Sequence, residues 1–236
     1  MKKRIIIFFS FLIFLFVCSI NCYAEDPINI IEKIIDTEEE QDLLKFVELY
    51  KSSNDENAPL YVGLAYHNLS LIDSIKYSSF AVDWLLKYNG KKFYSIALAY
   101  RGSAVTLVAN ALSKKGNLIG AASKLDEGFK LMDKAIKEDS SNIIIRFLRA
   151  ENGIEITETT PFDRSKIVEE DLNFLKDKLT NFSNLQKAQY YLILGRLKIY
   201  QKKIPEAISA LKQVIKEAPD SKYAKKAKQL LAKLED

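Results

Sequence analysis

The chain has 236 residues, a mass of 26.9 kDa, 48% hydrophobic positions and 28% charged positions. That is enough for one globular core, and it excludes a disordered linker or a collagen-like chain. Only 8 Gly and 5 Pro accompany 35 Lys plus Arg and 31 Asp plus Glu, and the formal net charge is +4 at pH 7. A composition with so few residues that break helices favours a mainly helical protein.

The N-terminus has the three parts of a secretory signal peptide over residues 1–24. Basic residues 2–4 precede an apolar run over residues 5–17, and a polar stretch ends at Ala24. We expect cleavage after Ala24, because the apolar run is shorter than the ~20 residues of a membrane-spanning helix. An uncleaved anchor is the alternative. The sequence therefore predicts an exported protein, periplasmic or secreted, with no stable membrane insertion after cleavage.

Cleavage would change the charge and the cysteine content of the protein. Three basic and no acidic residues would leave, so the mature chain would have 32 Lys plus Arg against 31 Asp plus Glu and a net charge of +1. Such a chain attracts phosphate backbones weakly, and we expect no nucleic-acid partner. Cys18 and Cys22 would leave as well, which excludes a disulfide, a thiol nucleophile or a thiolate metal site in the mature protein.

Apolar residues recur at helical spacing in nearly every segment after residue 25, which predicts an all-α mature domain. Thr37 followed by Glu40 predicts a capping box, and Gly90 is expected to end a helix in the left-handed conformation. About eleven helices are predicted, over residues 27–35, 37–50, 59–69, 74–88, 92–115, 118–137, 142–156, 168–179, 185–202, 205–217 and 221–234.

Short connections between these helices make sequential helices antiparallel neighbours, so the predicted architecture is a stack of antiparallel helical hairpins. The helix over residues 118–137 carries an apolar stripe that must face a neighbour, formed by Leu118, Ala122, Leu125, Phe129, Met132 and Ile136. The clearest loop covers residues 157–163. It predicts a division of the mature chain into an N-terminal helical-hairpin region, 25–160, and a C-terminal region, 161–236.

Residues 188–220 resemble a tetratricopeptide repeat (TPR), a helix–turn–helix unit that stacks into a superhelix. The family's large aromatic, leucine, glycine, small-residue and terminal-proline positions are matched by Tyr191, Leu194, Gly195, Ala207 and Pro219. The resemblance implies a close crossing of two helices at Gly195, with residues 221–234 as a capping helix. Lys198 and Val214 depart from the family pattern, which has an aromatic residue and alanine there.

The resemblance also implies a function and a surface. In this family the first helix of each repeat lines a concave groove that holds an extended peptide or a partner helix. The matching positions here are Gln189, Leu192, Arg196 and Ile199. Arg196 is the expected ion-pairing contact, because a guanidinium can bind a carboxylate through two parallel hydrogen bonds. The protein would then be a protein-binding or scaffolding module of the cell envelope.

The sequence indicates no catalytic residue, metal site or cofactor. His67 is the only histidine, and without a mature cysteine it cannot anchor a zinc site or a Ser-His-Asp site by itself, so we expect a structural or surface role. Acidic residues 38–40 and 169–171 are interpreted as first-turn residues that interact with helix dipoles. Phosphate-binding glycine loops, GxSxG elbows and HExxH helices do not occur.

Two other functions stay open. One is a glycan-directed enzyme of the cell envelope, for which Trp84, Phe93, Tyr94 and Tyr100 would offer an aromatic sugar platform, although aromatic residues at helical spacing are more often core residues. The other is a purely structural subunit of an envelope assembly, which would expose a large apolar patch. The identity of the protein or peptide partner and the oligomeric state are not predicted.

Overall fold

The computed structural model describes residues 25–235, and the predicted signal peptide lies outside them. The described residues form eleven α-helices, one short 3-10 helix and no strand. The α-helices are α1 (Pro27–Asp36), α2 (Glu40–Tyr50), α3 (Ala58–Ile72), α4 (Ser74–Lys87), α5 (Tyr94–Lys114), α6 (Leu118–Glu138), α7 (Ile143–Thr159), α8 (Ser165–Lys176), α9 (Asn184–Tyr200), α10 (Ile204–Glu217) and α11 (Lys222–Glu235). The all-α prediction is confirmed.

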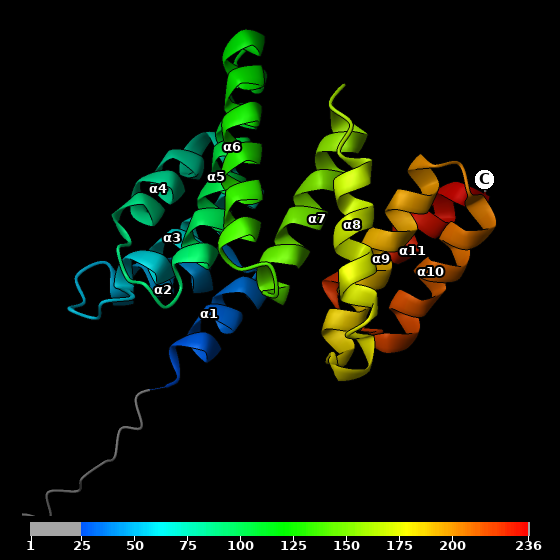
Figure 1. Ribbon diagram of the computed structural model, residues 1–236, viewed down its shortest axis with the longest axis horizontal. Coiled ribbons are helices and arrows are strands. Elements are labelled where there is room, and N and C mark those ends of the chain that lie inside the picture. The colour runs from blue at the N-terminus through cyan, green and yellow to red at the C-terminus, as the bar shows by residue number, and fades with distance from the viewer. Residues whose placement is uncertain (1–24, 236) are drawn as a thin grey trace, which may run out of the picture.

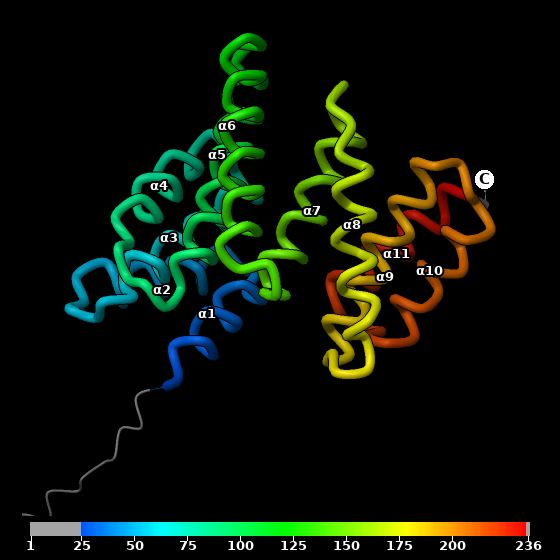
Figure 2. Tube along the Cα trace, in the orientation of Figure 1, coloured from blue at the N-terminus to red at the C-terminus, as the bar shows by residue number. Residues whose placement is uncertain are grey.

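Sequential helices fold back on one another as hairpins. Helix α3 packs against α4, α5 against α6, α7 against α8, and α9 against α10, with α11 following α10 (Figure 1). The trace in Figure 2 shows the chain reversing at the links between these helices. In addition, α1 contacts α3, α3 contacts α5, α5 contacts α7, α7 contacts α9 and α9 contacts α11. The first helices of successive hairpins therefore form one inner layer.

Each hairpin has a glycine where its two helices cross. The crossing glycines lie in the first helix of each pair and are Gly63, Gly102, Gly153 and Gly195. A methyl group on Gly102 would lie 2.7 Å from the carbonyl oxygen of Gly128 in α6. A methyl group on Gly195 would lie 2.8 Å from a terminal carbon of Leu211 in α10. A methyl group at any of these four positions would meet an atom of the partner helix at less than 3 Å.

The atoms that a new methyl group would meet differ between the crossings, so alanine substitutions should lower the free energy of unfolding by different amounts. Gly102→Ala would press against backbone, which cannot rotate away, and we expect a loss of about 1–3 kcal/mol of stability despite the better helix propensity of alanine. Gly195→Ala would press mainly against the Leu211 side chain, which can shift more easily than backbone, so the propensity gain of about 1 kcal/mol should offset most of the cost. Urea unfolding of both variants measures this, and equal losses would contradict it.

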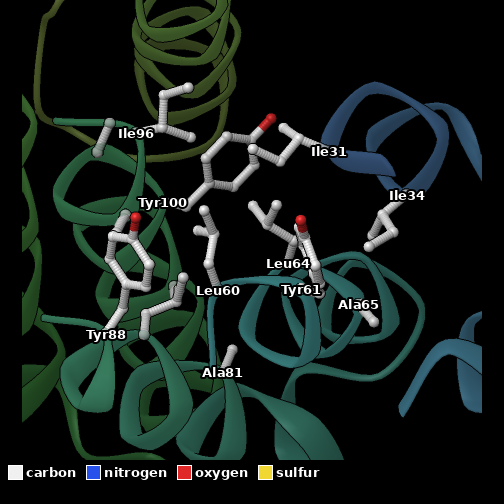
Figure 3. Packing of buried hydrophobic residues seen from close by; sticks show 14 of the residues in the cluster. Ile31, Ile34, Leu60, Tyr61, Leu64, Ala65, Ala81, Tyr88, Ile96 and Tyr100 are labelled. Atoms are coloured by element: carbon white, nitrogen blue, oxygen red, sulfur yellow. The ribbon is translucent and has the colours of Figure 1, made fainter. Parts of the chain in front are cut away.

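The hydrophobic core runs along the stack in connected clusters. The largest joins α1 to α5, where Ile31, Leu60 and Tyr100 pack together (Figure 3). Helix α7 takes part in three clusters. Ile145 packs into this first one, Ile154 packs into the next with α8 and α9, and Ile156 packs with residues of α5 and α6. Apolar packing therefore continues across the link between α7 and α8, where the sequence predicts a boundary.

A buried ionic cluster joins α6, α7 and α8. The Asp171 side chain of α8 is fully buried and accepts hydrogen bonds from Arg149 Nε and Nη2, both at 2.8 Å, and from Arg146 Nη1 at 2.7 Å. Arg149 also pairs with Asp133 of α6 at 3.0 Å. Because a buried charge is tolerated only when it is paired, these contacts hold the third hairpin in one arrangement.

Several local predictions are wrong. The Thr37 hydroxyl donates to the Lys33 carbonyl oxygen at 2.7 Å and so closes α1 instead of capping α2. Gly90 does not have a positive φ, whereas Gly116 does, at +79°. Acidic residues 169–171 lie beyond the first turn of α8, and two of them bind arginines of α7.

The predicted stripe of α6 is buried at four of its six positions. Leu125, Phe129, Met132 and Ile136 lie in the core, whereas Leu118 is 67% exposed at the start of the helix. The stripe faces α5, which is the partner of α6 in the second hairpin. Helical spacing thus identified the buried face of α6 from Leu125 onward.

Candidate functional site

The inner layer encloses a cavity of about 650 Å³ that is partly open to solvent. Its walls come from α1 and the residues that follow it, α3, α5, α7, α9 and α11. None of the second helices of the hairpins, α4, α6, α8 and α10, contributes a lining residue. The cavity is therefore a property of the whole stack, because segments from residue 32 to residue 226 meet around it.

Three of the four residues predicted to line a groove line this cavity. Gln189, Leu192 and Arg196 contribute to its wall from α9, whereas Ile199 packs with α10 and α11. Arg196 is only 8% exposed. Its guanidinium binds Glu155 at 2.6 Å and Glu158 at 2.5 Å, both on α7. The carboxylates expected from a partner are thus supplied to Arg196 by the chain itself.

A chain of hydrogen bonds crosses one wall of the cavity. The Asn68 side-chain amide donates to the carbonyl oxygens of Ile34 at 2.8 Å and Ile35 at 3.1 Å, at the end of α1. The ring of His67 lies between Asn68 Oδ1, at 3.2 Å from Nδ1, and Ser103 Oγ, at 2.9 Å from Nε2. These contacts connect α1, α3 and α5 across the inner layer.

The network assigns the tautomer of His67. Because the Asn68 amide nitrogen donates to the carbonyl oxygens, Asn68 Oδ1 faces the ring and can only accept, so His67 Nδ1 carries the proton. Nε2 then accepts from the Ser103 hydroxyl. Burial lowers the pKa of His67 from 6.5 to about 4, and the Asn68 hydrogen bond opposes this shift only in part. The residue is a neutral structural histidine.

This neutral histidine predicts a pH dependence. The unfolded chain takes up a proton near pH 6.5, whereas the folded chain excludes it down to about pH 4, so stability present above pH 6.5 is lost as the pH falls. The loss from His67 should reach about 3 kcal/mol at pH 4. NMR titration of the imidazole, the only one in the chain, measures its pKa directly. A value near 6.5 would contradict the assignment.

Three carboxyl groups that line the cavity have no ion-pair partner within the described residues, those of Glu32, Asp36 and Glu151. Glu151 of α7 is partly exposed to the cavity, and Asp36 lies at the end of α1 on the rim. Burial raises the pKa of Glu151, a shift that Lys222, Gln189 and Arg196 oppose only in part. Burial likewise raises the pKa of Asp36, against the effect of Lys222. Basic side chains line the same cavity, and Lys114 and Lys226 have no ion pair among the described residues either.

Two tyrosine hydroxyls complete this part of the cavity. Tyr100 of α5 and Tyr223 of α11 are 4% and 6% exposed, and both line the cavity. Among the described residues neither hydroxyl has a hydrogen-bond partner, and neither oxygen is fully buried, so each is open to the cavity. Burial raises the pKa of both phenols, and the charge of Glu151 adds to the shift in each. Tyr100, Glu151 and Tyr223 thus lie close together.

Sequence reasoning missed these residues, although one signal pointed to two of them. Glu151 and Tyr100 each lie two positions before a crossing glycine, Gly153 and Gly102, and therefore occupy the same place in their hairpins. When the hairpins are aligned on their crossing glycines, Tyr100 and Glu151 fall at the same position. Nothing comparable marks Tyr223, because α11 has no glycine.

The aromatic residues proposed as a sugar platform do not share one exposed face. Phe93 and Tyr100 are buried in the first core cluster, and Trp84 packs against that cluster. Tyr94 is exposed at the start of α5. Within the described residues these four side chains serve mainly the core.

Comparison of the chain with models of protein families, with curated proteins and with solved structures finds no match. The fold and the cavity are therefore what any functional conclusion must be built on.

Proposed function

We propose that this protein is an exported, TPR-like protein-binding or scaffolding module of the cell envelope, which binds a peptide or a partner helix in the cavity of its inner layer. The observation that carries the proposal is the cavity itself. Its lining comes from the first helices of all four hairpins and from both flanking helices, α1 and α11. A concave surface built from repeated helices is how stacked-hairpin proteins hold extended ligands.

The chemistry of the lining supports an occupant with both apolar and polar parts. Leu107, Phe147 and Leu192 contribute apolar surface, and Asn110 and Gln189 contribute amides that can bond a peptide backbone. Its volume of about 650 Å³ suits one or two side chains of a bound segment rather than a folded domain.

Export is part of this proposal and has two supports. Residues 1–24 carry the signal-peptide pattern. Within the described residues, no helix has the length and the apolar character needed to cross a bilayer.

Site-specific photo-crosslinking in the cell envelope tests the binding surface. A photoreactive amino acid replaces Asn110 on the cavity wall in one variant and Lys130 on the exposed face of α6 in the other. Both sites are solvent-exposed and helical, so they differ mainly in the face that they occupy. We expect a discrete protein adduct from position 110 and none from position 130. Equal adducts at both sites, or an adduct from position 130 alone, would contradict the proposal.

A glycan-directed enzyme is the second candidate, and one observation favours it. A carboxyl group whose pKa is raised by burial in a cavity, as at Glu151, has the property of a general acid that protonates a leaving group. In this role Glu151 would act on a glycosidic oxygen.

Incubation of the protein with purified envelope glycan tests this activity by measuring the release of new reducing ends. The enzyme hypothesis expects release by the wild-type protein and a loss of at least a hundredfold in Glu151→Gln. No release by the wild-type protein eliminates this candidate.

A further inference from the structure

The hairpin of α5 and α6 projects past its neighbours and ends in an apolar tip. Both helices have 21 residues, against 15 and 14 in α3 and α4 and 17 and 12 in α7 and α8. Figure 1 shows the turn between α5 and α6 rising beyond the ends of the other hairpins. The tip is formed by Leu118 and Ile119, which begin α6 directly after this turn and are 67% and 87% exposed. These are the largest exposed fractions of any large hydrophobic side chain in the described part of the chain.

More exposed apolar side chains flank the base of the tip. The Lys114 ammonium group, in the last turn of α5, donates to the Ser74 hydroxyl at 3.2 Å, which brings the link between α3 and α4 beside the hairpin. Next to this link, Ile72 and Ile75 are 53% and 49% exposed. Single exposed apolar residues are common on protein surfaces, whereas a group of them on neighbouring segments indicates a surface that contacts a partner or a membrane.

The sequence around the tip carries positive charge only. Lys114 and Lys115 precede the turn, and residues 84–125 include seven basic residues and no acidic one. Neither lysine has an ion-pair partner among the described residues. The acidic residue that the contacts place nearest is Asp73, and its carboxylate accepts hydrogen bonds from two backbone N–H groups at the start of α4. The tip therefore combines exposed apolar side chains with unpaired cations.

We propose that the tip of the α5–α6 hairpin docks on an anionic phospholipid bilayer. Leu118 and Ile119 enter the boundary between headgroups and acyl chains, and Lys114 and Lys115 lie beside the lipid phosphates. Binding at this boundary grows with buried apolar area and with attraction between basic residues and anionic lipids, and the tip supplies both. A projecting tip also reaches a broad flat surface before the rest of the stack does. The inference goes beyond the proposed peptide binding, because neither Leu118 nor Ile119 lines the cavity.

The turn holds the tip in a defined shape without any contact to lipid. Gly116 has a φ of +79°, in the left-handed region that suits glycine. Asn117 Oδ1 accepts a hydrogen bond from the Gly120 backbone N–H at 2.9 Å and so caps α6. Leu118 and Ile119 are thus already fixed on a helix, and insertion does not require the backbone to become ordered.

Sedimentation with lipid vesicles tests the proposal on residues 25–236. The described fold lies within these residues, and the apolar run of the predicted signal peptide would itself bind lipid. One vesicle preparation is phosphatidylcholine alone, and the other is an equimolar mixture of phosphatidylcholine and phosphatidylglycerol. We expect at least tenfold tighter binding to the mixed vesicles. Leu118→Ser combined with Ile119→Ser should weaken that binding at least tenfold, and Lys114→Gln combined with Lys115→Gln should remove most of the preference for anionic lipid.

Leu49→Ser combined with Leu86→Ser serves as the matched control. These leucines are 65% and 62% exposed, and they lie near the end of α2 and in the last turn of α4, away from the tip. The control should bind vesicles as the wild-type protein does. Because all four substituted side chains are largely exposed, both double variants should keep the wild-type melting temperature.

A fluorophore on a single introduced cysteine gives a second measurement, since both natural cysteines, Cys18 and Cys22, lie outside residues 25–236. We expect the emission of an environment-sensitive dye at position 119 to shift to the blue when mixed vesicles are added. The same dye at position 49 should show no shift.

Each alternative outcome would overturn the proposal. Absence of binding to the mixed vesicles, or equal losses in the tip variant and the control, removes the tip as a membrane contact. Equal affinity for the two vesicle preparations removes anionic lipid as the ligand. A wild-type dimer that the tip variant converts to a monomer, with vesicle binding unchanged, assigns the tip to contact between two copies of the chain. The adduct at position 110 tests peptide binding separately from all of these.

Discussion

The close approach of two helices at a glycine in each hairpin is the constraint on which the rest of the structure depends. At Gly102 the backbone of α5 lies so near α6 that a methyl group would touch the Gly128 carbonyl oxygen. Tight hairpins of this kind leave each first helix free to pack against the first helix of the next hairpin. The inner layer, and with it the cavity, follows from that repetition, although the hairpins differ in length and α5 and α6 are the longest helices described.

The inner layer combines polar groups that satisfy one another with polar groups that do not. On one wall, Asn68, His67 and Ser103 join three helices through hydrogen bonds, and burial keeps the His67 ring neutral. Across the cavity, Glu151 and Tyr223 stay without ion-pair or hydroxyl partners among the described residues. Arg196 is already paired with Glu155 and Glu158, so the open parts of the cavity wall are the better candidates for contact with a partner.

The fold was predictable because helical periodicity and short links are local properties. Every predicted helix exists, and the buried face of α6 follows from its spacing. The site was less predictable, because the partners of its residues lie far away in the sequence. Gln189, Leu192 and Arg196 do reach the cavity, but the ion pairs of Arg196 with Glu155 and Glu158 span about forty residues. The capping box predicted at Thr37 does not form, because the Thr37 hydroxyl donates instead to a carbonyl oxygen of α1.

The most direct test of the central claim, that the inner layer of the stacked hairpins is the binding surface, is a photo-crosslinking scan of both layers in the cell envelope. The account predicts adducts with one protein from cavity positions on several inner helices, such as Leu71, Asn110 and Gln186, and none from the outer helices α6 and α10. Adducts confined to the outer helices, or no adduct from any cavity position, would contradict it.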